Sequence, residues 1–339
     1  MSLLTLRRLA FMCALLPMAL LAHAQYPLKV TLSSPGPDSF SYLPIDLIKR
    51  IGADRAEGVE LEVRYFGGGP RAAKDMLSGN SDFAALGMSA LATYYAGNKD
   101  LRSIVSVSRA PTYVLSVRSE LRDNIRKIAD LRGRAIGVHS GGRNSKSTSR
   151  QLVEFMLEQS GVRAESANFL SAGQSYEEQH AALASGTIDA LMGEEPFTSR
   201  FKHEGLVYVL ADLHDPIVAR QTLGGAFLYV QIATRGSLMA QQPEKVKRMV
   251  AVMRRTLQWI AAHTPDEIAR ALGGNPERIA DARQILARSK SAFSPDGVFR
   301  REEVSTTERF YRYVFKDNPQ ARALRLTDFI DARYAGWQE

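Results

Sequence analysis

Strand-like and helix-like segments alternate along most of this chain, and that alternation restricts its fold more than any other feature. The segment 135–138 is apolar, a loop rich in glycine and serine follows it, and the run 150–160 then has the apolar spacing of a helix. Similar units recur from residue 28 onward. A β-α-β order favours a mostly parallel sheet with helices on both faces. The sequence therefore predicts an α/β fold.

The alternating pattern restarts near the middle of the chain, where Pro111 precedes a new strand. The segments 77–84 and 183–190 also share an order: each ends a helix, turns through a glycine and opens a strand near an aspartate. A chance likeness of two such turns is one explanation. Two similar α/β lobes in tandem are the explanation that we favour.

The last third of the chain has helical spacing and no predicted sheet of its own. We expect a long helix that begins at Pro243 and ends at His263, and Thr264 with Glu267 has the pattern of a capping box for the next helix. Six apolar residues form one stripe of the long helix: Val246, Met249, Val250, Met253, Leu257 and Ile260. Because such a stripe must be buried, we predict that this tail packs on an earlier lobe.

The N-terminus has the pattern of an export signal. Two arginines precede an apolar run, and the small residues of Ala22-His23-Ala24 follow it as a cleavage site. We predict that residues 1–24 are removed and that the mature chain begins at Gln25; an uncleaved membrane anchor is the alternative. Cys13, the only cysteine, lies within this signal. The mature chain would then have no disulfide, thiolate metal site or cysteine nucleophile, which suits the bacterial periplasm.

The charge and the motifs argue against nucleic-acid binding and against catalysis. The formal net charge is +8, but the basic residues are dispersed, as on a solvated surface, and they are not interleaved with aromatic residues. The segment Gly87-Met88-Ser89-Ala90-Leu91 lacks the last glycine of a nucleophile elbow, the sequence has no His-Glu-x-x-His zinc motif, and its histidines are scattered. We therefore expect no enzyme, no metal and no cofactor.

Several short patterns occur in a fixed order along the chain. They are Val63-Arg64-Tyr65-Phe66-Gly67-Gly68-Gly69-Pro70, the segments 77–84 and 128–138, the helix start Ser147-Thr148-Ser149, the segment 183–190 and Glu195-Pro196-Phe197. In this order and spacing the chain resembles the substrate-binding proteins of nitrate, sulfonate and taurine ABC importers, including the thiamine-precursor type. The resemblance covers nearly all of the predicted mature chain.

The resemblance implies a two-lobed α/β fold, the periplasmic-binding-protein fold of type II, with a hinge and a ligand cleft between the lobes. Lobe one would comprise 25–112 and 222–339, with the C-terminal helices packed on it, and lobe two would comprise 113–221. The ligand would bind in the cleft, the lobes would close by hinge bending, and the closed form would dock on a membrane permease with its ATPase. The protein would be a periplasmic monomer.

The resemblance also implies which residues line the cleft, because ligands of open α/β sheets bind beyond the carboxyl ends of parallel strands. The expected ligand-binding residues are Ser33, Ser34, Pro35, Gly68, Gly69, Met88, Ser89, Arg109, Ser147, Thr148 and Glu195. Hydroxyl and backbone N–H groups of Ser89, Ser147 and Thr148 would donate to the oxygens of a sulfonate, nitrate or carboxylate. Arg109, near the crossing between the lobes, would supply positive charge.

Two departures from the family pattern leave the ligand class open. The loop 140–146 is long and basic, so Arg143 or Lys146 faces either the ligand or solvent. Glu194 and Glu195 stand where an aromatic residue is common, and an acidic pair in the cleft would suit an amine or an aminopyrimidine ring. In the other interpretation Glu194 points away and Glu195 caps the helix that follows.

The predicted function is that of a solute-binding component of an ABC importer, which binds a small organic or inorganic anion. One alternative is an aminopyrimidine ligand of the thiamine-precursor type. Another is a ligand-sensing subunit that reports to a membrane receptor, since import and sensing use the same two-lobed clamp. Genes for a permease and an ATPase beside this one would decide for import.

Overall fold

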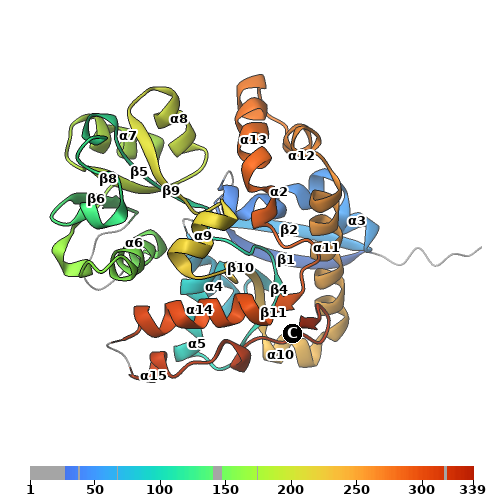
Figure 1. Ribbon diagram of the computed structural model, residues 1–339. Helices are drawn as coiled ribbons and strands as arrows, with labels where there is room; N and C mark the ends of the chain where they lie inside the picture. The colour runs from blue at the N-terminus through green and yellow to red at the C-terminus, as the bar shows by residue number, and fades with distance from the viewer. Residues whose placement is uncertain (1–26, 37–38, 67, 140–146, 174, 317–318) are drawn as a thin grey trace, which may run out of the picture.

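Two five-stranded sheets, each flanked by helices, form the two lobes of the protein (Figure 1). The computed structural model describes residues 27–36, 39–66, 68–139, 147–173, 175–316 and 319–339. The predicted α/β class is confirmed, because the strands of one sheet lie within 28–106 and 230–235 and those of the other within 113–212. The lobe boundaries at 112/113 and 221/222 stay a prediction. The predicted export signal, residues 1–24, lies outside the described residues.

Lobe one contains the sheet with strand order β2-β1-β3-β10-β4. Its elements before the chain crosses to the other lobe are β1 (Leu28–Pro35), η1 (Phe40–Tyr42), α2 (Leu43–Arg50), α3 (Ala53–Ala56), β2 (Val59–Phe66), α4 (Gly69–Leu77), β3 (Phe83–Gly87), α5 (Met88–Gly97) and β4 (Leu101–Ser106). Its elements after the chain returns are β10 (Val230–Arg235), α10 (Gly236–Gln241), α11 (Pro243–Ala262), α12 (Pro265–Leu272), α13 (Pro276–Ser289), η5 (Lys290–Ala292), β11 (Phe299–Arg300), α14 (Arg301–Val314), α15 (Pro319–Arg322), η6 (Leu326–Asp328) and β12 (Trp337–Gln338).

Lobe two contains the sheet with strand order β7-β6-β8-β5-β9. Its elements are β5 (Tyr113–Arg118), η2 (Ser119–Leu121), η3 (Ile128–Leu131), β6 (Ala135–Val138), α6 (Thr148–Gln159), η4 (Ala164–Ser166), β7 (Asn168–Ser171), α7 (Tyr176–Ala184), β8 (Ala190–Glu194), α8 (Phe197–His203), β9 (Val207–Asp212) and α9 (Pro216–Leu223). Each sheet has one antiparallel strand, β10 in lobe one and β5 in lobe two. In both lobes this is the first strand after the chain crosses, and the other strand pairs follow the predicted parallel order.

Gly137 lies in β6, where the chain has no room for a side chain. A Cβ atom built on Gly137 would lie 2.5 Å from Cδ1 of Ile188 and 3.1 Å from Cβ of Ala172. We expect Gly137→Ala to reduce the free energy of unfolding by about 1–3 kcal/mol, the usual range for overpacking a core. Urea denaturation measures this change. Gly97→Ala is the matched control, because nothing lies within 4 Å of a Cβ atom built there. Equal effects of the two substitutions would contradict the packing argument.

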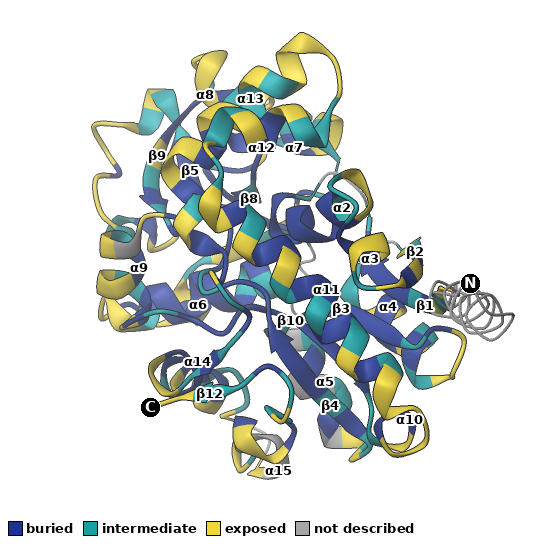
Figure 2. Cartoon of the chain, turned by 90° about the vertical axis from the view of Figure 1, so that its right-hand side faces the viewer, coloured by how far each residue is buried: buried dark blue, intermediate teal, exposed yellow. Residues whose placement is uncertain are grey.

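The C-terminal helices cover lobe one as predicted. All six residues of the predicted stripe on α11 are buried, and α11 contacts α2 and α3 (Figure 2). The capping box of α12 is also present: Thr264 N donates to Glu267 Oε2 at 2.8 Å, and Glu267 N donates to Thr264 Oγ1 at 3.3 Å. One helix of this tail, α14, also contacts lobe two, where Phe310 meets Phe155 of α6 edge to face. None of the helices within the described residues is long and apolar enough to cross a membrane.

The two segments that cross between the lobes, 107–112 and 224–229, run side by side. Val107 N donates to Val230 O at 2.8 Å, and Phe227 N donates to Arg109 O at 2.6 Å. The returning segment is also fixed to α14, because Leu228 N donates to the buried Thr307 Oγ1 at 2.9 Å. The connection between the lobes is therefore a paired strip of backbone that rests on one helix of lobe one.

Candidate ligand-binding site between the lobes

Three of the predicted residues, Ser33, Ser34 and Pro35, form the carboxyl end of β1. Ser33 Oγ donates to Asp75 Oδ2 of α4 at 2.6 Å, so this hydroxyl holds the sheet to its helix. Ser34 Oγ is buried and has no hydrogen-bond partner within the described residues. Because a buried hydroxyl without a partner costs free energy, Ser34 is the one of the three whose side chain has most to gain from a ligand.

Four more predicted residues lie at the starts of two neighbouring helices. Gly68 precedes α4 with φ at 113°, a conformation that favours glycine, and Gly69 begins the helix. Met88 and Ser89 begin α5, which contacts α4. Met88 is buried, and its carbonyl accepts a hydrogen bond from the Tyr311 hydroxyl of α14. The two helix starts therefore follow β2 and β3 at the carboxyl edge of the lobe-one sheet.

In lobe two the predicted residues Ser147 and Thr148 start α6. Ser147 caps the helix: its Oγ accepts from the backbone N–H three residues further on at 3.4 Å and lies 2.9 Å from Ser149 Oγ. Ser149 Oγ in turn accepts from His139 N at 3.0 Å, which ties the helix start to the end of β6. The predicted strand and helix cap are therefore present, while the loop 140–146 between them lies outside the described residues.

Arg109, the predicted source of positive charge, is held by α14. Its Nε lies 2.5 Å from Oε1 of Glu303, whose side chain is fully buried. Burial raises the pKa of the Glu303 carboxyl, and the charge of Arg109 opposes that rise. The guanidinium of Arg109 therefore neutralises a buried carboxylate of lobe one. The other two basic candidates, Arg143 and Lys146, lie outside the described residues.

Glu194, at the end of β8, lies among side chains from both lobes. Ser39 Oγ of lobe one donates to Glu194 Oε2 at 3.2 Å. Tyr113 of lobe two and Tyr229 of lobe one both lie within the field of the Glu194 charge, and the centroids of the two tyrosine rings lie 6.2 Å apart. Polar and aromatic side chains of both lobes therefore lie around Glu194. We call Ser39, Tyr42, Tyr113, His139, Glu194 and Tyr229 the Glu194 cluster.

The charge of Glu194 acts on every other titratable side chain of the Glu194 cluster. Burial first, and then the charge of Glu194, raises the pKa of Tyr42, Tyr113 and Tyr229. Burial lowers the pKa of His139, and Glu194 opposes that change. The three phenols are therefore protonated at neutral pH and the imidazole is neutral. Within the described part of the chain, no arginine or lysine forms an ion pair with Glu194.

Glu195, the predicted ligand-binding acid, points to a different set of partners. Its carboxylate accepts from Ser199 N and Ser199 Oγ, each at 3.0 Å, and it forms an ion pair with Arg288 of α13. Glu195 therefore satisfies an N–H group in the first turn of α8, as the capping interpretation proposed. Glu194, which that interpretation directed away, is the acid that lies among the aromatic residues between the lobes.

Sequence reasoning placed Tyr42 and Tyr113 only in a helix and a strand and overlooked Tyr229 as a site residue. One signal was available for the latter two. Tyr113 lies two residues after Pro111, at the first crossing, and Tyr229 lies just before β10, at the second. Side chains beside the crossings are placed between the lobes by the chain path itself.

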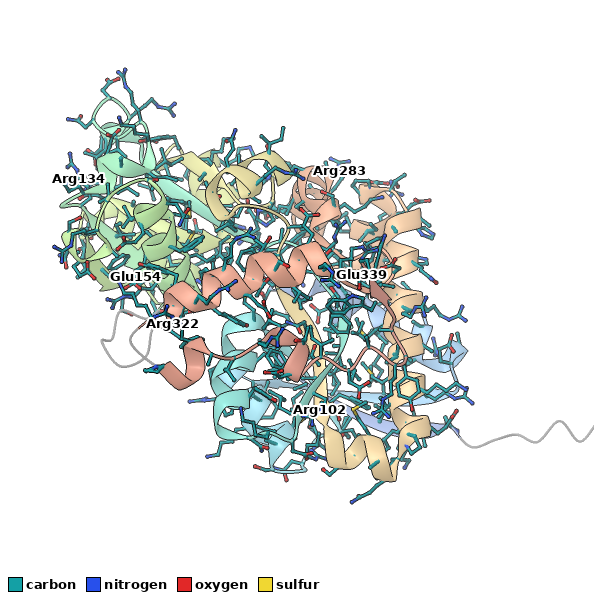
Figure 3. The ribbon with its side chains drawn as sticks, turned by 60° about the horizontal axis from the view of Figure 1, so that its bottom comes forward. Arg102, Arg134, Glu154, Arg283, Arg322 and Glu339 are labelled. Carbon is teal, nitrogen blue, oxygen red and sulfur yellow. The ribbon has the colours of Figure 1, made fainter. Side chains whose placement is uncertain are left out.

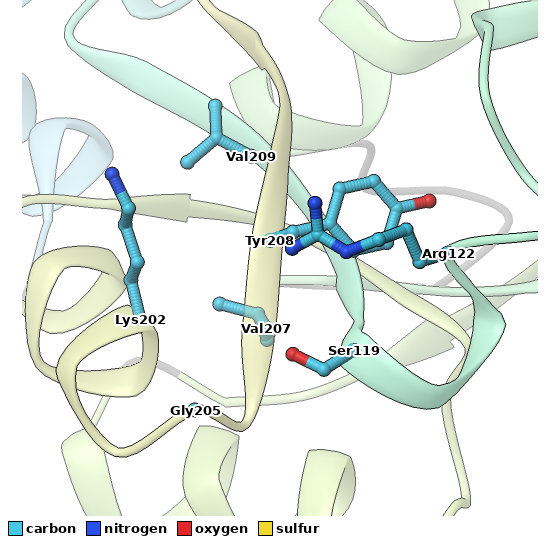
Figure 4. A pocket seen from close by; sticks show the side chains of 7 residues that line it. All are labelled: Ser119, Arg122, Lys202, Gly205, Val207, Tyr208 and Val209. Carbon is cyan, nitrogen blue, oxygen red and sulfur yellow. The ribbon is translucent and has the colours of Figure 1, made fainter.

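A separate hollow lies at β9, the edge strand of the lobe-two sheet (Figure 4). It is lined by Ser119, Arg122, Lys202, Gly205, Val207, Tyr208 and Val209. The Arg122 guanidinium lies 4.6 Å from the centroid of the Tyr208 ring. One of the two cationic side chains that line this hollow is therefore already engaged in a cation–π contact. It contains no predicted site residue and no member of the Glu194 cluster. The part of the chain that the structure describes contains no group of three acidic, histidine or cysteine side chains that could hold a metal ion.

Comparison with solved structures defines the class of fold. A protein of Bordetella bronchiseptica RB50 superposes with a TM-score of 0.75 at 23% identity, covering 91% of this chain and 95% of that one. The alkanesulfonate-binding protein SsuA from Xanthomonas axonopodis pv. citri, bound to MOPS, gives 0.67 at 16% identity, covering 93% and 100%. A Candida albicans protein described as having the generic periplasmic binding protein structural fold gives 0.67 at 16% identity, covering 89% and 96%. At these identities the likeness shows the fold alone, and this chain has the periplasmic-binding-protein fold.

The family follows from the sequence comparison. The family model described as "NMT1/THI5 like" matches residues 55–268, more than half of the chain. The protein therefore belongs to the NMT1/THI5-like family. A relative from Brucella abortus (strain 2308), which carries the name "Putative binding protein", is 27% identical over 198 residues. That alignment covers 58% of this chain and 56% of the relative, so the chain spans little more than half the length of this relative.

Proposed function

We propose that this protein is the periplasmic solute-binding component of an ABC importer and that its ligand is a small molecule with N–H donor groups, of the aminopyrimidine type. The ligand would lie between the lobes and contact the Glu194 cluster. The observation that carries this proposal is the carboxylate of Glu194, which lies among partly or fully buried aromatic side chains from both lobes without a described cationic partner.

The chemistry of the Glu194 cluster supports a donor-rich ligand over a bare anion. A carboxylate repels a sulfonate or nitrate, whereas it accepts strong hydrogen bonds from an amine or a ring N–H. Tyrosine side chains offer flat apolar faces to a heteroaromatic ring and keep a hydroxyl for hydrogen bonding. A ligand that touches Tyr113 of lobe two and Tyr229 of lobe one would also contact both lobes at once, as a hinge-closing ligand must.

A second candidate is the anion that the sequence predicted. Two observations favour it: solved structures with this fold include an alkanesulfonate-binding protein, and α4, α5 and α6 all begin at predicted site residues. The N–H groups and the dipoles at the starts of these helices would favour the oxygens of a sulfonate, nitrate or carboxylate. In this case the ligand would contact Ser34, Ser147 and Thr148.

The same proposal includes the cellular setting. A cleaved export signal at residues 1–24 would place the protein in the periplasm, where it would deliver its ligand to a membrane permease with its ATPase. It would act as a monomer and without catalysis. A role as a ligand-sensing subunit of a membrane receptor would give the same ligand binding but no uptake. Ligand uptake by vesicles that contain a permease and an ATPase encoded beside this gene distinguishes the two roles.

Thermal unfolding in the presence of chosen ligands tests which class binds. We expect 4-amino-2-methylpyrimidine to raise the unfolding midpoint and methanesulfonate, nitrate and benzoate to leave it unchanged. A ligand that binds only the folded state adds about 2.7 kcal/mol of stability at 100 times its Kd, enough for a clear shift. A shift with an anion alone, lost in the double variant Ser147→Ala/Thr148→Ala, would contradict the Glu194 proposal and support the second candidate.

A further inference from the structure

The end of helix α13 joins the two lobes at a place outside the Glu194 cluster. Arg288, in the last turn of α13, forms ion pairs with two carboxylates of lobe two, Glu195 and Asp212. Its Nε lies 3.3 Å from Asp212 Oδ2, and its guanidinium also donates to Ser199 Oγ at 3.0 Å. Because α13 packs on α12 and η5 of lobe one, these contacts exist only when the lobes have the arrangement seen here.

A second ion pair connects the same surfaces with the opposite polarity. Arg200 of α8 places its Nε 3.4 Å from Oδ2 of Asp281, which lies about two turns before Arg288 on α13. Lobe one thus presents an acid and a base to lobe two, and lobe two presents a base and two acids in return. Reciprocal charges of this kind are complementary in one relative position of the two surfaces and repel in shifted ones. In Figure 1 α13 and α8 face each other across the upper part of the molecule.

The two acids of lobe two that Arg288 contacts are shielded from solvent to different degrees. The Glu195 side chain is 1% exposed, and the Asp212 side chain is 20% exposed. Burial by itself would raise the pKa of Asp212, but hydrogen bonds with His214 and the charge of Arg288 lower it. Arg288 is the cation that faces both carboxylates, and its own side chain is 37% exposed. Because Glu195 is buried, removing this cation costs more than losing an ion pair between two exposed side chains.

We propose that Asp281 and Arg288 of lobe one, with Glu195, Arg200 and Asp212 of lobe two, form an interlobe latch that holds the lobes closed even without ligand. The contacts of the latch do not depend on the proposed function. Only their expected consequence, slower release of a bound ligand, rests on it. None of the five residues belongs to the Glu194 cluster. The latch acts by lowering the free energy of the closed arrangement, so it increases affinity for any ligand that requires closure.

Spin labels on the two lobes test the latch in the ligand-free protein. Lys202→Cys on α8 and Lys247→Cys on α11 place labels at exposed positions of lobe two and lobe one, in a Cys13→Ser background that has no other cysteine. Pulsed electron paramagnetic resonance then measures the interlobe distance. We expect a main population at the distance of the closed arrangement. We expect Arg288→Gln to reduce the ratio of closed to open protein by about tenfold and to populate longer distances.

A matched control lies on the same helix. Arg283, labelled in Figure 3, is 58% exposed and pairs with Asp266 of its own lobe, so Arg283→Gln removes an arginine of α13 without touching lobe two. Glu195→Gln tests the latch from the other side and keeps the shape of the side chain that Ser199 contacts. Far-UV circular dichroism checks that each variant is folded.

Three outcomes would overturn the latch. They are a ligand-free parent protein found only at the longer distance, unchanged distances in both Arg288→Gln and Glu195→Gln, and an equal shift in Arg283→Gln. Because no ligand is present in this experiment, its result does not depend on the ligand class. Failure of every ligand in the thermal experiment, with an intact response of the distances to Arg288→Gln, would reject the proposed ligand and keep the latch.

Discussion

Glu194→Gln is expected to weaken the binding of 4-amino-2-methylpyrimidine by about a hundredfold. The substitution keeps the size of the side chain but removes the charge that accepts from the ligand, and a hydrogen bond to a charged group contributes roughly 1.5–3 kcal/mol. Ser39, which donates a hydrogen bond to Glu194, would keep a carbonyl oxygen as its acceptor, so the fold should be little affected. Isothermal titration calorimetry at constant pH measures the affinity.

The control for this experiment is Glu60→Gln, which removes an exposed acid from β2 of lobe one. It changes the net charge of the protein by the same amount, so an effect of overall charge would appear in both variants. Unchanged affinity in Glu194→Gln would remove Glu194 from the ligand contacts. An increased affinity for anions in that variant would indicate that Glu194 selects against them.

Arg109→Met is expected to lower the free energy of unfolding by about 2–3 kcal/mol at pH 8, because it leaves the buried carboxylate of Glu303 without its cation. Burial already raises the pKa of Glu303, and Arg109 opposes that rise, so the substitution raises this pKa further. The folded protein then binds the proton of Glu303 more tightly than the unfolded chain does. The stability that the folded protein gains from the protonated Glu303 carboxyl is fully present below the ordinary glutamate pKa. It is lost as the pH rises through the pKa of Glu303 in the folded protein.

Urea denaturation at pH 5 and pH 8 should therefore show a gap between parent and Arg109→Met that widens with pH. Adding Glu303→Gln to Arg109→Met should recover most of the loss at pH 8, since the buried group is then neutral. Arg312→Met changes an exposed residue of α14, the helix that contains Glu303, and should change the free energy of unfolding by less than about 0.5 kcal/mol. A gap that is equal at the two pH values would show that Arg109 acts through packing and not through the charge of Glu303.

Features that depend on neighbours in the sequence were predictable. The capping box at Thr264 and the serine cap of α6 follow from residues within one helical turn, and the apolar stripe of α11 follows from a spacing that repeats along one helix. The restart of the alternating pattern after Pro111 likewise marks the first strand of the second sheet. These features carry the fold class, because periodicity and helix caps are local consequences of side-chain chemistry.

The polar partners across the lobes were not predictable in the same way. Glu194 and Glu195 are adjacent, and the sequence offered no means to decide which of them lies among the aromatic residues between the lobes and which caps α8. That choice depends on Arg288, which lies 93 residues from Glu195. The role of Arg109 depends on Glu303, which lies 194 residues away. A charged side chain near a crossing has several possible partners, and only the tertiary arrangement selects one.

The strand order of lobe one has a consequence for how the chain acquires its structure as it is made. In that sheet β4 pairs with β10, which begins at residue 230, whereas every strand of lobe two lies between residues 113 and 212. Lobe two can therefore assemble its complete sheet while lobe one still lacks an internal strand. The first half of lobe one must wait, with the edges of β3 and β4 unpaired, until the chain returns. Unpaired strand edges are sites at which chains aggregate. A chaperone that covers residues 83–106 would therefore be needed most before residue 235 has been synthesised.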